Sequence, residues 1–291
     1  FNSQAFAKIV SLIGCHGRSL PLRKLFIVKI KGCHGFFYTT FHIDTITMLP
    51  PLSQSKLPRS ETPSPEADVE IPTWQQEIKT AFRLADELCR FLNIDPAEVG
   101  ISVPAAKQFP LFVPRGFARR MESGNPDDPL LRQVLNVVQE EVSDAQFKVD
   151  PVGESQVGIA PGLLQKYAGR ALMVVTGVCA VHCRYCFRRH FPYQSFQQIG
   201  AEVGRWQLAL DAVRSDESIH EVLLSGGDPL VLTDDLLTEL LTMLENIPHL
   251  KRLRIHTRTP IVIPSRVTQT LVKRLASSRL AVWFVVHANH G

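Results

Sequence analysis

The stretch that decides the fold is Ala171-Leu-Met-Val-Val-Thr-Gly-Val178, which runs directly into Cys179-Ala-Val-His-Cys183-Arg-Tyr-Cys186. Residues 171–178 form an apolar run rich in β-branched side chains, which predicts a buried strand. The three cysteines follow with C-x3-C-x2-C spacing, so we expect them on the loop that leaves this strand. Three thiolates can bind three irons of a [4Fe–4S] cluster and leave the fourth iron open to a small molecule, whereas a fourth cysteine would close the cluster.

Simpler explanations of the three cysteines remain open. They could form a zinc site with His182 or His190 as the fourth ligand, or a redox pair with a spare thiol, or be a chance grouping. The buried strand before them favours the open cluster, because a zinc knuckle does not need a parallel strand beneath it. The basic residues Arg184, Arg188 and Arg189, which accompany the cysteines, favour it as well.

Strand and helix patterns alternate through the second half of the chain. The sequence predicts strands at 171–178, 221–225, 253–257 and 281–287, with helices at about 201–214, 234–246 and 265–277. Such alternation indicates parallel strands with right-handed crossovers, an α/β class that suits either a (β/α) barrel or a flavodoxin-like open sheet.

Polar clusters decide between these two architectures. One follows each predicted strand: the cysteines, then Gly226-Gly227-Asp228, then Arg258, then the run from His287 to His290. In α/β barrels the active site is built at this carboxyl end of the strands. We therefore expect a partial (β/α) barrel, truncated after about four βα units and preceded by a small helical region.

The chain divides into four parts. Residues 1–47 contain six basic side chains and one acid, which is typical of a transit peptide, but we expect them to be translated upstream sequence, with Met48 as the natural start. Residues 48–70 are rich in proline and serine and predict a disordered leader. Residues 71–157 form a helical region, with helices expected at 74–93 and 129–141, and residues 158–291 form the catalytic core.

Composition excludes several classes of protein. The chain has 291 residues, of which 45% are hydrophobic, enough to bury a sizeable core. A net charge of +4 is too small to indicate nucleic acid or an anionic membrane as partner. No run reaches about 18 apolar residues, so no membrane span is indicated. Clustered ligand cysteines require a reducing compartment, and we expect the protein to be cytoplasmic.

The strand, the cysteine spacing and the basic run resemble the radical S-adenosylmethionine (SAM) superfamily. The run Cys183-Arg-Tyr-Cys-Phe-Arg-Arg-His-Phe-Pro-Tyr193 is similar to the lysine 2,3-aminomutase family, in particular to members that make β-lysine for modifying elongation factor P. The resemblance covers roughly Trp74 to the end of the chain. Four further runs carry it: residues 124–133, 161–167, 224–230 and 252–264.

The resemblance implies isomerisation of L-lysine to β-lysine by a 5′-deoxyadenosyl radical, with a [4Fe–4S] cluster, SAM and pyridoxal 5′-phosphate (PLP) as cofactors. It also assigns roles to individual side chains. Cys179, Cys183 and Cys186 would bind iron; Ser225, Gly226, Gly227 and Asp228 would contact SAM; Arg188 would bind the lysine carboxylate; Lys166, Tyr167 and Arg170 would surround the PLP phosphate; and Arg258 would lie near the PLP ring.

Lys166 departs from the family pattern, in which arginine is usual at this position. A lysine still supplies a cation but lacks the planar fork of a guanidinium. Arg189 is expected to be a solvated loop residue. His287, Asn289 and His290 are expected in the wall of the site.

The lysine that forms the resting Schiff base with PLP is expected beyond Gly291. Lys251 and Lys273 are the only lysines after Cys186, and their predicted places, before a strand and within a helix, do not suit that role. We therefore expect the 291-residue chain to assemble a cluster but not to turn over lysine. The implied partners are lysine, an electron donor such as flavodoxin or ferredoxin, and elongation factor P with its lysyl-transferring ligase.

Other functions remain open at this stage. They are a catabolic lysine or glutamate 2,3-aminomutase, a radical SAM enzyme without PLP, and a zinc or iron–sulfur binding module without activity.

Overall fold

The structure is a computed structural model. It describes the backbone of residues 27–31 and 36–40, and residues 73–142, 148–193, 204 and 206–289. The leader predicted at 48–70 lies outside the described residues, as does most of the segment 1–47.

One mixed sheet of eight strands forms the body of the described structure, in the order β2-β1-β8-β7-β6-β5-β4-β3. Strands β5, β6, β7 and β8 are parallel neighbours, and β1 adds parallel to β8. The β1–β2, β3–β4 and β4–β5 pairs are antiparallel. The strands are β1 (Ile27–Lys31), β2 (Phe36–Thr40), β3 (Gly158–Ala160), β4 (Leu163–Tyr167), β5 (Arg170–Thr176), β6 (Glu221–Gly226), β7 (Arg252–Thr257) and β8 (Ala281–Ala288).

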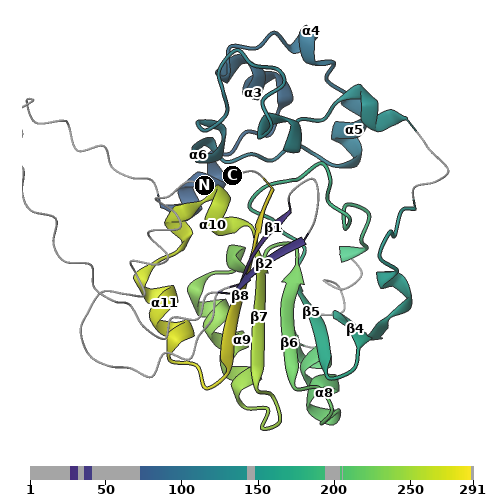
Figure 1. The fold of residues 1–291 in the computed structure, drawn as a ribbon, viewed down its shortest axis with the longest axis vertical. Coiled ribbons are helices and arrows are strands. Elements are labelled where there is room, and N and C mark those ends of the chain that lie inside the picture. Colours follow the sequence, from purple (N-terminus) through teal and green to yellow (C-terminus); the bar gives the residue numbers. More distant parts are fainter. Residues whose placement is uncertain are drawn as a thin grey trace, which may run out of the picture.

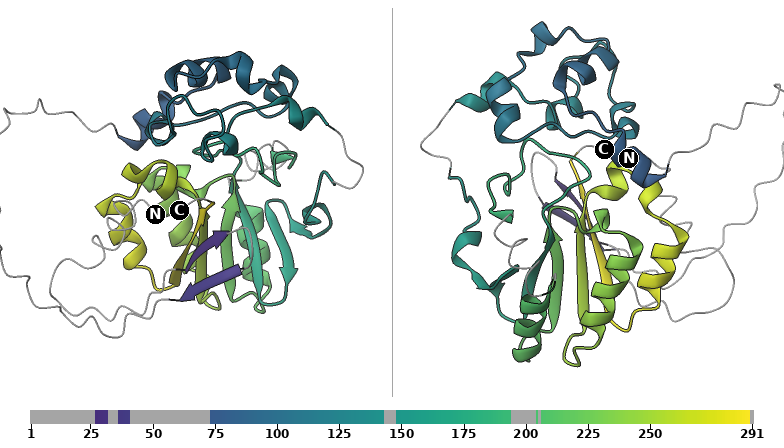
Figure 2. Two further views of the ribbon diagram at one scale, coloured as in Figure 1. Left: turned by 45° about the horizontal axis from the view of Figure 1, so that its top comes forward. Right: turned by 180° about the vertical axis from the view of Figure 1, so that it is seen from behind.

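The four predicted parallel strands are thereby confirmed, and so are the helices that connect them. These are α8 (Gln207–Ser215), α9 (Asp234–Glu245) and α11 (Gln269–Ala276), with short turns η4 (Pro229–Val231), α10 (Thr259–Val262) and η5 (Pro264–Arg266). The view from behind in Figure 2 shows the long helices in front of the strands. Thr233 caps α9, its hydroxyl accepting the Leu236 N–H.

The two faces of the sheet differ in burial. Toward the helices, residues such as Met173, Leu224 and Ile255 are fully buried in one apolar core with α8, α9 and α11. On the other face a row in register, Leu172–Leu223–Arg254–Trp283, is only half-buried. A sheet with helices outside and a partly open inner face is what a partial (β/α) barrel requires, so the α/β architecture agrees with the prediction.

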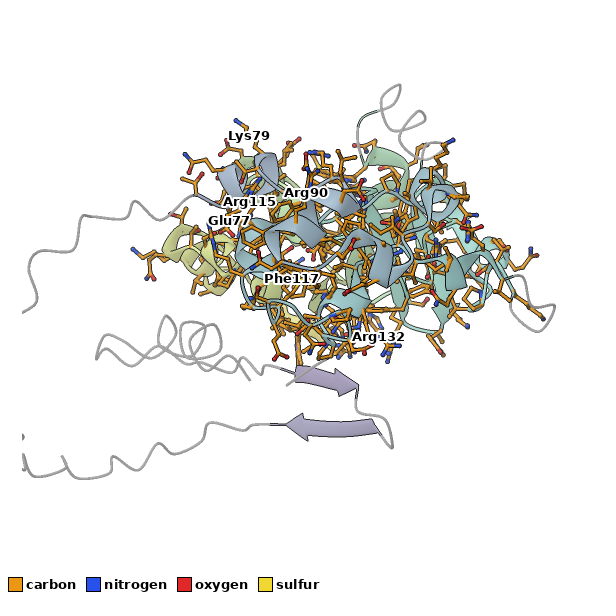
Figure 3. All side chains as sticks on the ribbon, turned by 90° about the horizontal axis from the view of Figure 1, so that it is seen from above. Glu77, Lys79, Arg90, Arg115, Phe117 and Arg132 are labelled. Atoms are coloured by element: carbon orange, nitrogen blue, oxygen red, sulfur yellow. The ribbon has the colours of Figure 1, made fainter. Side chains whose placement is uncertain are left out.

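Residues 73–142, here called the cap, lie over the carboxyl ends of β5 to β8 (Figure 1). The cap contains α2 (Trp74–Lys79), α3 (Ala85–Phe91), α4 (Pro96–Val99), α5 (Val103–Gln108), α6 (Arg115–Ala118), η1 (Leu131–Gln133) and η2 (Val138–Glu141). Seen from above, its side chains cover this end of the sheet (Figure 3). Its apolar core includes Ala180, Val181, Val262 and Ile263 from the loops below, so the cap and these loops form one packed unit.

Two helix predictions in the cap are wrong. The segment 74–93 is two helices, because Phe82 and Val113 exchange backbone hydrogen bonds of 2.8 and 3.0 Å between α2 and α3. The segment 129–141 contains only the short 3₁₀ turns η1 and η2. Its backbone is engaged by 100–102 instead: Val138 N–H donates to the Gly100 carbonyl, and the Asn136 side-chain amide to the Ser102 carbonyl at 2.6 Å.

No helix in the described ranges is long and apolar enough to cross a membrane.

Candidate active site

The cysteine loop, defined as residues 177–193, begins where β5 ends and is fastened to the cap. His182 N–H donates to the Phe112 carbonyl at 3.0 Å, and Arg184 N–H donates to the Gln133 carbonyl at 2.8 Å. The loop therefore lies between the cap and the carboxyl ends of the parallel strands, which is the edge where the sequence predicted the active site.

The three thiols of the loop lie within electrostatic reach of one another. Burial raises the pKa of Cys179, and Asp228, Cys183 and Cys186 raise it further, while Arg188 lowers it. Burial also raises the pKa of Cys186, against the effect of a backbone N–H and of Arg188. Burial thus disfavours the thiolates of Cys179 and Cys186, and a bound metal or a nearby cation would favour them. The thiolate is the form that binds metal.

The donor set fits an iron–sulfur cluster. Three cysteines on one loop can each bind a different iron, and guanidinium groups nearby can donate to cluster sulfur and offset its negative charge. Within the part of the chain that the structure describes, no three Cys, His, Asp or Glu side chains are grouped so as to hold a single metal ion.

His182, one of the two histidines considered as a zinc ligand, packs into the cap. Its Nδ1 lies 2.8 Å from the Pro110 carbonyl oxygen, and its ring stacks on Phe109 with centroids 4.8 Å apart. Burial lowers the pKa of this imidazole. His182 thus fastens the cysteine loop to the cap through one ring nitrogen, while His190 is exposed.

The two glycines after β6 allow two loops to approach closely. A Cβ on Gly227 would lie 2.2 Å from the Val178 carbonyl oxygen, and one on Gly226 would lie 2.5 Å from the Thr176 carbonyl oxygen. In the resulting contact, Gly227 N–H donates to Thr176 O at 2.7 Å and Asp228 N–H to Val178 O at 2.8 Å. The glycines therefore hold the stem of the cysteine loop, and SAM contact at this motif stays a prediction.

Asp228 joins the ends of β6 and β7. It is 4% exposed, and its Oδ1 accepts from Thr257 Oγ1 at 2.7 Å and from Leu230 N. Its Oδ2 accepts from the backbone N–H groups of Arg258 at 2.7 Å and Thr259 at 2.9 Å. Four protein donors satisfy this carboxylate, so in the structure Asp228 acts as a tie between two strand ends.

Arg258 points into the cysteine loop. Its Nη1 lies 2.7 Å from Cys183 Sγ and also donates to the Tyr185 hydroxyl, and its Nη2 donates to the Gln133 side chain. Burial raises the pKa of Tyr185, and Cys183 raises it further. The Tyr185 ring in turn meets the His287 ring edge-on at 5.7 Å. Arg258 and His287 thus both lie at the cysteine loop, while their roles near PLP and in the wall of the site stay predictions; His290 lies outside the described residues.

Arg188 is held on two sides. Its Nε and Nη2 bind the Glu154 carboxylate at 2.7 and 2.5 Å, and its Nη1 donates to Ser225 Oγ at 2.8 Å. The side chains of Arg188 and Glu154 are 7% and 13% exposed. Arg188 and Ser225, predicted as substrate and SAM contacts respectively, are therefore neighbours at the carboxyl end of β6.

The sequence of this chain resembles the sequences of known proteins. The chain is 51% identical over 218 residues to the L-lysine 2,3-aminomutase of Escherichia coli, an alignment that covers 75% of the chain and 63% of that protein. Over three quarters of its length the chain is similar to L-lysine 2,3-aminomutases. Identity is 44% over 221 residues with the Haemophilus influenzae protein (76% and 64% covered) and 30% over 224 residues with that of Clostridium subterminale (77% and 53%).

The chain spans roughly one half to two thirds of the length of these family members. No family model matches it.

The structure does not bring the predicted PLP-phosphate residues to the cysteine loop. Lys166 and Tyr167 end β4, and Arg170 begins β5, whereas the cysteines follow the other end of β5, roughly 20 Å away. Lys166 Nζ donates to the Val152 carbonyl at 2.8 Å, and Arg170 pairs with Glu221 at 3.6 Å. Tyr167 is 64% exposed. The PLP role of these three residues stays a prediction.

Sequence reasoning missed the acids that pair with the loop arginines. Glu140 accepts from Arg184 at 2.8 and 2.7 Å and from Arg189 at 2.9 Å, so Arg189 is paired and only 17% exposed, not the solvated residue expected. Glu154 does the same for Arg188. Three arginines within six residues signal that carboxylates must lie nearby, but nothing in the sequence says which ones.

Proposed function

We propose that the protein to which this chain belongs isomerises L-lysine to β-lysine by radical chemistry. The observation that carries the proposal is the 51% identity to an L-lysine 2,3-aminomutase over 218 residues, three quarters of the chain. The meeting of Cys179, Cys183, Cys186, Arg188 and Arg258 at one edge of the sheet supports it.

When bound, the cluster and SAM would supply the 5′-deoxyadenosyl radical, and PLP would stabilise the unpaired electron on the substrate. The chain's own residues would bind and orient. The three cysteines would hold the cluster, with Arg258 donating an N–H to Cys183. Arg188 would pair with the lysine carboxylate, since a guanidinium matches a carboxylate in a planar, two-bond contact. The cap, packed over this edge, would keep water away from a reactive radical.

We further propose the setting of this activity. The product would serve to modify elongation factor P through a lysyl-transferring ligase, and a flavodoxin or ferredoxin would supply the electron. Reduced cysteines suit a cytoplasmic location. The 291-residue chain would bind a cluster without turning over lysine, because neither lysine after Cys186 suits the Schiff base with PLP. Lys251 precedes β7 at the edge opposite the cysteines, and Lys273 is exposed on α11.

The test is anaerobic reconstitution with iron and sulfide, followed by an assay for β-lysine from lysine with SAM, PLP and a reductant. We expect about four irons per chain and loss of iron when any of the three cysteines is replaced by alanine. The complete protein should form β-lysine and no β-glutamate. Formation of β-glutamate, or zinc in place of iron, would overturn the proposal. Turnover by the 291-residue chain would contradict only the statement about that chain.

A further inference from the structure

The contact between Arg188 and Glu154 is unusual because both side chains are nearly buried and both carboxylate oxygens bind along one side of the guanidinium. Nε and Nη2 are 2.7 and 2.5 Å from the two oxygens of Glu154. This planar, two-bond geometry fixes both the position and the plane of the guanidinium group. Ser225 Oγ at 2.8 Å from Nη1 and the ring of Phe187 at 4.8 Å add two further restraints.

The turn that carries Glu154 is held in shape independently of Arg188. Residues 154–156 form the 3₁₀ turn η3, and the Asp150 carboxylate accepts the backbone N–H groups of Glu154 at 3.0 Å and Ser155 at 2.8 Å. These hydrogen bonds lower the pKa of Asp150 to about 2. From the other side, Lys166 Nζ donates to the Val152 carbonyl. A preformed turn therefore presents the Glu154 carboxylate to Arg188.

Charge and donors remain available after this pairing. A guanidinium has five N–H donors, and Glu154 and Ser225 take three of them, with the Gly226 carbonyl at a long 3.5 Å from Nη1. Three guanidinium groups of the cysteine loop, those of Arg184, Arg188 and Arg189, pair with only two carboxylates, those of Glu140 and Glu154. The neighbourhood keeps an excess positive charge, so an incoming carboxylate is still attracted.

We propose that Glu154 is a positioning residue: it holds one edge of Arg188 so that the remaining Nη donors are oriented for the carboxylate of an α-amino acid substrate. The inference rests on the proposed function of Arg188. Without Glu154, the long arginine side chain would have to be ordered by the substrate itself, and binding would weaken for ligands that carry the carboxylate.

The first test needs no ligand. Glu154→Gln keeps the shape of the side chain and removes its charge; Glu217→Gln, at an exposed acid after α8, makes the same charge change far from the site. In arginine-labelled protein, the Arg188 Nε–H signal, assigned by its loss in Arg188→Lys, should exchange slowly with water. Exchange should accelerate at least about tenfold in Glu154→Gln and stay unchanged in Glu217→Gln. Equal exchange rates in all three proteins would overturn the inference.

The second test compares L-lysine with cadaverine, which lacks only the carboxylate, by equilibrium dialysis. We expect Glu154→Gln to weaken lysine binding about tenfold and to leave cadaverine unaffected, because only the carboxylate interacts with Arg188. In the double variant with Arg188→Met, the Glu154 effect should vanish. Weaker binding of both ligands would indicate a merely structural role, and tighter lysine binding would mean that Glu154 competes with substrate; either result overturns the inference.

The same experiment separates this inference from the proposed function. If Arg188→Met weakens lysine binding and Glu154→Gln does not, the inference falls and the role of Arg188 stands. If wild-type protein does not prefer lysine to cadaverine, or Arg188→Met leaves lysine binding unchanged, both fall. Glu154→Asp, which keeps the charge and shortens the side chain, serves if the glutamine variant does not fold and should show the same loss specific to lysine.

Discussion

Replacing Gly227 by alanine would place a methyl carbon 2.2 Å from the Val178 carbonyl oxygen, and a real Cβ essentially never lies closer than 3.0 Å to such an atom. The obstacle is backbone, so it cannot rotate away as a side chain could. The stem of the cysteine loop would have to move by about 1 Å, and Cys179, the next residue along, would move with it. The hydrogen bonds Gly227 N–H to Thr176 O and Asp228 N–H to Val178 O would lengthen.

The expected cost combines overpacking, about 1–3 kcal/mol, with two weakened hydrogen bonds at about 1 kcal/mol each. We expect Gly227→Ala to lose about 3–5 kcal/mol of unfolding free energy, which lowers Tm by roughly 10 °C. Urea unfolding and iron content after anaerobic reconstitution would measure this. Gly158→Ala is the matched control, since its Cβ would meet only Leu164 Cδ2, at 4.0 Å. A Gly227→Ala protein within about 1 kcal/mol of wild type, with full iron, would refute the argument.

Three further predictions concern charged groups. Burial opposes ionisation of Glu140, but Arg184 and Arg189 outweigh it and hold the pKa of this carboxyl below its usual value. The ionised Glu140 therefore stabilises the fold above its unfolded pKa of about 4.3, and this contribution is lost as the pH falls through the lower folded pKa. In urea titrations, Glu140→Gln should make the free energy of unfolding decline less steeply between about pH 5 and 3. Parallel curves for the variant and the wild type would contradict this. Glu221 is buried among three arginines. Glu221→Gln should lower the free energy of unfolding by about 2–3 kcal/mol in the same assay. A loss below about 0.5 kcal/mol would show that this cluster contributes little to stability. Arg258→Lys keeps the charge but loses the fork that reaches Cys183, so the cluster's reduction potential, followed by electron paramagnetic resonance, should fall; an unchanged potential would exclude an effect through the sulfur.

The parallel core could be predicted because its signals are local. An apolar run rich in β-branched residues, such as residues 171–178, predicts a strand of the core, and the polar residues placed after each strand identify the functional edge of the sheet. The helices around the sheet follow the 3.6-residue period, with a threonine cap at Thr233. These features depend on short stretches of chain, so one sequence is enough to read them.

The helices of the cap were predicted less accurately, because the backbone hydrogen bonds of the cap join residues that are far apart in the sequence. Periodicity favoured helix at 74–93 and 129–141, but Phe82 pairs with Val113 and Val138 with Gly100, and these bridges replace helical bonds. The same holds in the site. The carboxylates of Glu140 and Glu154 come from 34 to 49 residues before their arginine partners. No spacing rule links residues so far apart.

The shared packing of the cap and the cysteine loop has a consequence for the lifetime of the protein in the cell. Ala180 and Val181, which lie between the first and second cysteines, belong to the same apolar core as Leu88 and Phe117 of the cap. A cluster that binds only the ordered loop stabilises the whole core by mass action. Iron supply should therefore set how often the cap opens to proteases, and iron-starved cells should degrade the apoprotein faster without any change in its synthesis.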